Sequence, residues 1–185
     1  GNGGDLTIIA ADSVDIAGPN TNNSSSPTGL FSYAVKEGSK ADAGNIIIST
    51  PQLFMQQSNI SASTRNDGNA GSITLKVDNL TVRDSSTIQT ATYAGGNGGD
   101  LTVIAADSID IAGFRNSDDG GYFPSAIYSF GSQSSTGDAG NLNISSKQIN
   151  IRDRGSIVTT NLGSGNAGDL NVNADNIFLD NQASL

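Results

Sequence analysis

Apolar and polar residues alternate in short segments along this chain, and the segments recur in a fixed order. Each recurrence opens with Gly, then Asp, Asn or Ser, then Leu or Ile, any residue, and an aliphatic residue. This signature begins at Gly4, Gly44, Gly71, Gly99, Gly140 and Gly168, in steps of 40, 27, 28, 41 and 28 residues. The chain is therefore an array of six units, which we number one to six in chain order, and the base unit has 27 or 28 residues.

A short unit contains three alternating segments, and each segment predicts a β-strand. In unit three they are residues 73–75, 80–82 and 88–90. A period of two with Ile, Val and Thr is typical of strands, whereas Gly-rich joints and the lack of a 3.6-residue period argue against helices. Strands this short bury no apolar face alone, so we expect units to stack about 4.8 Å apart with parallel pairing. One internal column would then contain Leu6, Ile46, Ile73, Leu101, Leu142 and Leu170.

The predicted fold is all-β, a parallel β-helix or β-solenoid of about six coils with two loop insertions. A longer repeat lies above the unit: residues 1–18 return as 96–113 with sixteen of eighteen positions identical. We therefore expect residues 1–185 to be one solenoid segment from a longer array, built of two three-coil super-repeats, 1–95 and 96–185.

An Asn or Asp stands two residues before every signature glycine. The six residues are Asn2, Asp42, Asn69, Asn97, Asp138 and Asn166. In stacked coils they would line up at one corner, where a side-chain amide or carboxylate bonds to the turn backbone or to the next amide. We interpret this column as a structural ladder.

Units one and four are lengthened at the same joint, between the second and third segments. The insertions are Gly18–Gly29 and Gly113–Ser125, and both should bulge from one edge, three coils apart. The candidate contact residues in the second insertion are Arg115, Asp118, Asp119, Tyr122 and Phe123. After each insertion comes a segment with two aromatic residues, 30–33 and 127–130. Their rings would face outward, where they are either shielded by the loops or form a binding platform.

Composition excludes several classes of function. The chain has 9 Lys and Arg against 18 Asp and Glu, no His and no Cys, and a formal net charge of −9. Nucleic acids and anionic membranes both require clustered cations, so neither is an expected partner. No apolar run is long enough to span a bilayer. Without Cys, disulfides and thiolate metal sites are excluded.

Two patterns suggest ligand chemistry, but only weakly. Residues 95–103, GGNGGDLTV, partly match the calcium-binding nonapeptide of RTX proteins, yet the unit length differs from nine and Thr102 replaces an aliphatic residue. Residues 83–84 and 152–154 carry Arg and Asp after the second segment, but a polysaccharide-cleaving site needs convergent carboxylates. We expect Arg152 to pair with Asp180 of the next unit instead. We therefore expect no catalytic centre and no cofactor, and a weak Ca²⁺ site at the Gly-Asp corners stays open.

The strings GNGGDLTI, GNAGSITL, DAGNLNI and GNAGDLNV, with ISAST and IQTAT further along, resemble the repeat region of filamentous-haemagglutinin-like exoproteins. The likeness covers essentially all 185 residues and is strongest to large cyanobacterial members exported by two-partner secretion. It implies a long right-handed β-helical fibre, export through the outer membrane, and a role in adhesion or the extracellular matrix. The secretion domain of that family is not among these residues, and the family has no active site to carry over.

We therefore expect a structural or adhesive segment of a secreted cell-surface or extracellular fibre, and not an enzyme. One alternative is a carbohydrate-binding or carbohydrate-cleaving β-helix that holds sugar at Tyr122, Phe123 or Tyr128. Another is a filament subunit that assembles with itself end to end. The expected partners are thus a host-surface or matrix glycan and the chain itself.

Overall fold

The computed structural model describes residues 1–18, 28–36, 38–116 and 120–185. These ranges hold fourteen β-strands and no helix, and hence no helix that could cross a membrane. The strands are β1 (Leu6–Ile9), β2 (Ser13–Ala17), β3 (Thr28–Ala34), β4 (Ile46–Gln56), β5 (Ser58–Thr64), β6 (Ile73–Arg83), β7 (Thr87–Thr92), β8 (Leu101–Ala112), β9 (Phe114–Asn116), β10 (Tyr122–Pro124), β11 (Ala126–Gly131), β12 (Leu142–Arg152), β13 (Ser156–Asn161) and β14 (Leu170–Leu179).

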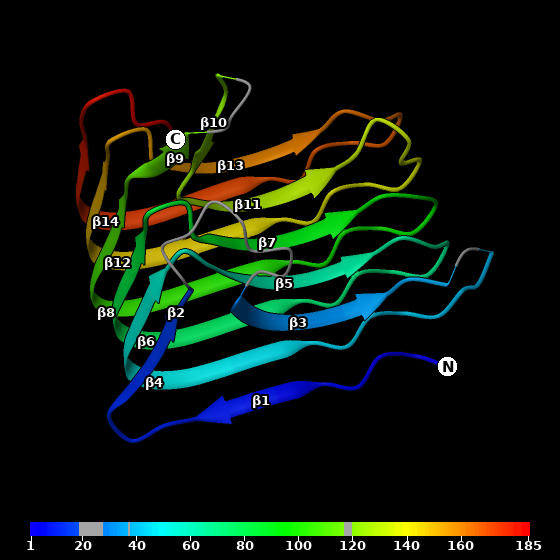
Figure 1. The fold of residues 1–185 in the computed structure, drawn as a ribbon, viewed down its shortest axis with the longest axis horizontal. Coiled ribbons are helices and arrows are strands. Elements are labelled where there is room, and N and C mark those ends of the chain that lie inside the picture. The colour runs from blue at the N-terminus through cyan, green and yellow to red at the C-terminus, as the bar shows by residue number, and fades with distance from the viewer. Residues whose placement is uncertain (19–27, 37, 117–119) are drawn as a thin grey trace.

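Two parallel sheets contain twelve of these strands, and consecutive units supply neighbouring strands. Sheet A has the order β1-β4-β6-β8-β12-β14, with β2 also paired to β4, and sheet B has the order β13-β11-β7-β5-β3. The chain alternates between the sheets, so the strands stack one above another and the two termini lie at opposite ends of the stack (Figure 1). The predictions of an all-β chain and of parallel pairing between units are confirmed.

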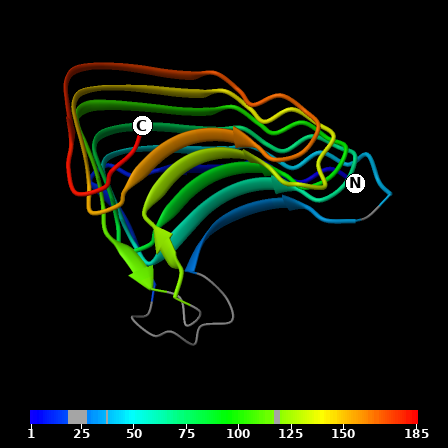
Figure 2. The same cartoon turned by 90° about the horizontal axis from the view of Figure 1, so that it is seen from above.

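The prediction of three separate strands per unit is wrong for units two to six. There the first and second segments form one long strand, because ladder pairing continues through the corner between them. In β6 the pairs with β4 run from Ile73↔Ile46 to Arg83↔Gln56. These long strands turn sharply where one face of the molecule meets the next (Figure 2). Only unit one keeps its first two segments apart, as β1 and β2.

The predicted aliphatic column lies inside the stack. Leu6 pairs with Ile46, and the register continues through the rest of the column to Leu170. Ile46 and its three successors Ile73, Leu101 and Leu142 are fully buried. Sheet B faces them with a second column, Ile60, Ile88, Ile127 and Ile157, which is also fully buried. Each such side chain contributes about 1.5–3 kcal/mol relative to exposure in water, so the stack is held together along its whole length.

Close approach between units explains why each signature begins with glycine. A Cβ atom at Gly44, Gly71, Gly99, Gly140 or Gly168 would lie 2.0–2.1 Å from the carbonyl oxygen of the signature glycine one unit earlier. No unit among the described residues stacks before Gly4, and a Cβ there would meet nothing within 4 Å. The signature glycine is therefore required by the backbone of the adjacent unit.

Candidate binding surfaces

The predicted corner residues are joined from unit to unit by hydrogen bonds. Each side-chain oxygen accepts from the backbone N–H of the corresponding residue one unit later, from Asn2 to Asp42 through to Asp138 and Asn166. The five N···O distances are 2.7–3.2 Å. The column thus satisfies backbone donors at the bend where the ladder between strands is interrupted.

A second column of this kind follows the signature glycine. Asp5 accepts from the N–H of Asn45 at 2.7 Å, and Asp100 accepts from the N–H of Asn141 at 2.8 Å. From the sequence, this column is assessed only as a possible calcium site. The Asp, Asn or Ser that follows every signature glycine is nevertheless a sequence signal for a second ladder of hydrogen bonds. One carboxylate oxygen of Asp5 and of Asp100 is thus already engaged by a backbone donor. In the described ranges, no group of three or more His, Cys, Asp or Glu residues is placed to hold a metal ion.

The expected ion pair between Arg152 and Asp180 is not formed. Arg152 donates to both carboxylate oxygens of Asp110 at 3.0 and 3.1 Å, and Arg83 donates to the same carboxylate at 2.9 Å. Asp110 belongs to unit four, between the two arginines, so one carboxylate joins three consecutive units. These groups are too exposed for the pairs to add more than about 1 kcal/mol each. The Arg and Asp residues here bind each other and form no convergent pair of carboxylates.

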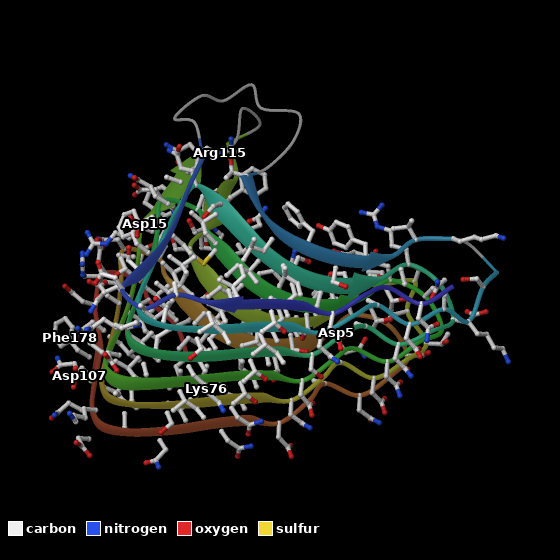
Figure 3. The ribbon with its side chains drawn as sticks, turned by 90° about the horizontal axis from the view of Figure 1, so that it is seen from below. Asp5, Asp15, Lys76, Asp107, Arg115 and Phe178 are labelled. Carbon is white, nitrogen blue, oxygen red and sulfur yellow. The ribbon has the colours of Figure 1, made fainter. Side chains whose placement is uncertain are left out.

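The second insertion contains an antiparallel hairpin, β9 and β10, with Phe123 opposite Arg115. The hairpin projects from the corner between the two sheets (Figure 2), and Arg115 lies there (Figure 3). The guanidinium of Arg154, in unit five, lies 4.8 Å from the ring centre of Phe114 and 4.5 Å from that of Tyr122. Arg115 lies 5.3 Å from the ring centre of Phe123. Cations therefore already contact the aromatic rings of the hairpin.

The remaining loop predictions fall outside the described ranges. These cover Asp118 and Asp119, and residues 19–27 of the first insertion. Of the five candidate contact residues, the structure describes Arg115, Tyr122 and Phe123, and it brings all three together in the hairpin. The rings of Tyr122 and Phe123 are about half exposed.

A second aromatic surface lies on the outer face of sheet B. Phe31 and Tyr33 of β3 alternate with inward residues, as do Tyr128 and Phe130 of β11. Tyr93 follows β7, with its ring centre 6.1 Å from that of Phe130. We call these five residues the aromatic strip. Tyr33 is 49% exposed, so the loops do not shield the whole strip.

The tyrosines of the strip influence one another electrostatically. The pKa of Tyr128 is raised to about 12, first by burial and then by the nearby phenols of Tyr93 and Tyr33, against a hydrogen bond with Thr87 that lowers it. Burial also raises the pKa of Tyr33, while a hydrogen bond with Ser61 and the charge of Arg65 lower it. Both hydroxyl groups therefore stay protonated at neutral pH and can donate hydrogen bonds.

No family model, curated protein or solved structure matches this chain.

Proposed function

We propose that the chain is part of a right-handed parallel β-helix of about six coils, and that it serves as a structural and adhesive segment of a secreted cell-surface or extracellular fibre. The observation that carries the proposal is the parallel pairing of each unit with the next in both sheets, with register shifts only where β8 pairs with β6 and with β12. Stacked units of this kind extend by addition of further units, each stabilised by its neighbours. The resemblance to filamentous-haemagglutinin-like exoproteins points the same way.

The surface chemistry supports a role as an extended, solvated rod. The formal net charge is −9, which keeps long rods apart in solution. Lys76 and Asp107 project from the outer face of sheet A (Figure 3). A rod with this surface presents a large area of repeated side chains, which suits many weak contacts along its length.

Immunogold electron microscopy of native cells tests the proposal. Antibodies raised against residues 1–185 should label filaments at the cell surface or in the surrounding matrix. Preincubation of the antibodies with the purified chain is the control and should remove the label. Label confined to the cell interior, or to discrete particles without filaments, would contradict the proposal.

A further inference from the structure

The outer face of sheet B differs in charge from the rest of the molecule. None of its five strands, β3, β5, β7, β11 and β13, contains a charged residue. The chain as a whole carries 18 acidic residues against 9 Lys and Arg, and the strands of sheet A hold charged residues of both signs, namely five Asp, two Lys and two Arg. Sheet B is therefore a neutral face on an anionic molecule. Its strands curve so that this outer face is concave (Figure 2).

The rings of the aromatic strip lie over the sheet. Phe31 and Tyr33 pair in register with Ser61 and Ser63 of the next unit. These serines point outward, yet Ser61 is 0% and Ser63 4% exposed. Outward side chains this small are buried only if larger neighbours cover them, so the rings lie across the sheet. The rings of Phe31 and Tyr33 are also nearly parallel, at 28° and 5.4 Å.

Polar groups suited to hydroxyl recognition surround these rings. The guanidinium of Arg65 lies 5.3 Å from the ring centre of Tyr93 and is close enough to Tyr33 to lower the pKa of that phenol. The amide of Gln89 occupies the outward position between Ser61 and Tyr128. Flat aromatic faces beside amide, hydroxyl and guanidinium donors are the chemistry that binds sugar rings, which have an apolar C–H face and a polar rim.

We propose that the aromatic strip binds a linear polysaccharide. Pyranose rings stack on Tyr33 and its aromatic neighbours, while Arg65 donates to hydroxyl or carboxylate oxygens of the sugar. The face has no carboxylate in its strands, so even a uronate polymer, repelled elsewhere by this acidic chain, is accepted there. In the β9–β10 hairpin, Arg154 or Arg115 contacts each of the rings of Phe114, Tyr122 and Phe123, whereas in the strip an arginine contacts Tyr93 alone, so the hairpin is the less suitable site. The inference rests on the adhesive role proposed above and names its ligand class.

Affinity electrophoresis tests this binding with two probes, alginate as a uronate polymer and hydroxyethyl cellulose as a neutral glucan. The wild-type chain should be retarded by at least one of them. The double variant Tyr33→Ser with Tyr93→Ser should bind more weakly, on the order of tenfold. Both serines are residues that an adjacent unit holds at the equivalent position, Ser63 and Ser132, so the variant is expected to fold. Circular dichroism checks this.

The matched control removes two aromatic rings from the hairpin, with Tyr122→Ser and Phe123→Ser, and should leave retardation unchanged. Arg65→Ala separates the ligand sources: it should weaken binding to alginate while binding to hydroxyethyl cellulose persists. The proposal is overturned if neither polysaccharide retards the wild-type chain, or if the hairpin variant loses binding while the strip variant keeps it. Immunogold labelling is independent of this result, so the fibre proposal and the glycan proposal can fail separately.

Discussion

At the scale of single residues, side-chain oxygens of the corner column complete the backbone pairing from one unit to the next. Asn97 shows both sides of this role. Its N–H donates to Asn69 and its side-chain oxygen accepts from the N–H of Asp138, both at 3.0 Å. Asn and Asp both provide this oxygen, which explains why the column contains either residue without loss of the ladder.

Asn97→Ala removes the acceptor and should destabilise the chain. The N–H of Asp138 would then bond only to water, and because this corner is exposed we expect a loss of about 0.5–1.5 kcal/mol. Urea denaturation followed by circular dichroism measures the change in the free energy of unfolding. Asn97→Asp retains the oxygen and should stay close to wild type. An equal loss in both variants would show that the oxygen is not what stabilises the corner.

Tyr128 predicts a dependence of stability on alkaline pH. Its pKa is about 12 in the folded chain against 10.0 as the ordinary value, because burial disfavours the phenolate. A raised pKa of this acid stabilises the folded chain below pH 10, and this contribution is lost as the pH rises through about 12. With about 1.4 kcal/mol for each pKa unit, the loss should be roughly 2–3 kcal/mol between these limits.

Tyr128→Phe has no phenol to ionise, so its stability should fall less over this range than that of the wild type. Urea denaturation at pH 9 and pH 12 compares the two chains. Tyr122→Phe is the control, because Tyr122 is 51% exposed and its replacement should leave the wild-type pH dependence in place. If all three chains lose equal stability, burial of Tyr128 does not control the alkaline transition.

At the scale of elements, the spacing between adjacent strands is set at the signature glycines. A Cβ at position 140 would lie 2.0 Å from the carbonyl oxygen of Gly99, and neither backbone can move without breaking bonds such as Leu101 N–H to the carbonyl of Asn141. Gly140→Ala should therefore cost about 3 kcal/mol or more. Gly4→Ala is the matched control and should change stability by less than about 0.5 kcal/mol, because a Cβ there has open space.

Thermal unfolding followed by circular dichroism compares these two glycine variants. A clear fall in Tm for Gly140→Ala with little change for Gly4→Ala is the expected result. If the two variants shift Tm equally, the effect comes from the backbone preferences of alanine compared with glycine. It then does not come from contact between units.

Much of the element pattern could be predicted from sequence because a period of two, repeated six times, leaves one register that turns the paired aliphatic residues of every unit inward. The column from Leu6 to Leu170 follows from this. The fusion of the first two segments into one strand could not, because side-chain alternation does not report whether backbone pairing continues through a bend. The contact of Arg152 with Asp110 was also beyond the sequence, since Asp110 and Asp180 both lie in units adjacent to unit five.

The hairpin and the aromatic strip show the same limit for candidate sites. Spacing indicated that Phe31, Tyr33, Tyr128 and Phe130 face outward, and the structure agrees. The spacing did not indicate that Tyr93 and Arg65 lie beside these four rings, because both residues follow their strands and fall outside the alternating pattern. The position of Arg154 against the hairpin also depends on a turn, where Arg154 has a φ of 64°.

At the scale of the whole molecule, stability depends on how many neighbours each unit has. Ile149 and Ile151 of unit five are fully buried, whereas Ile177 and Leu179, which pair with them from unit six, are 44% and 47% exposed. Unit one likewise leaves Leu6 and Ile8 partly buried. Stacked repeats gain stability from each interface between neighbours, so the two end units are the least stable part of the described stack.

A tandem chain tests this dependence, because unit one repeats the sequence that follows unit three. Residues 96–113 stack on unit three through the β6–β8 pairing, and residues 1–18 match them at sixteen of eighteen positions. The tandem chain consists of residues 1–185, a copy of residues 89–95 and a second copy of residues 1–185. The copy of residues 89–95 continues the third segment of unit six. Unit one of the second copy then follows in register. The junction should reproduce the interface between units three and four.

The tandem chain should unfold in one transition at a higher Tm than the single chain, because the junction buries Ile177, Leu179, Leu6 and Ile8. Small-angle scattering should show a rod that lengthens along the stack by about 4.8 Å for each added unit. The control joins the two copies through seven Gly and Ser residues, which cannot supply the strand, and it should keep the Tm of the single chain. Equal Tm values, together with scattering from two independently moving bodies, would mean that matching sequence alone does not specify the interface between units.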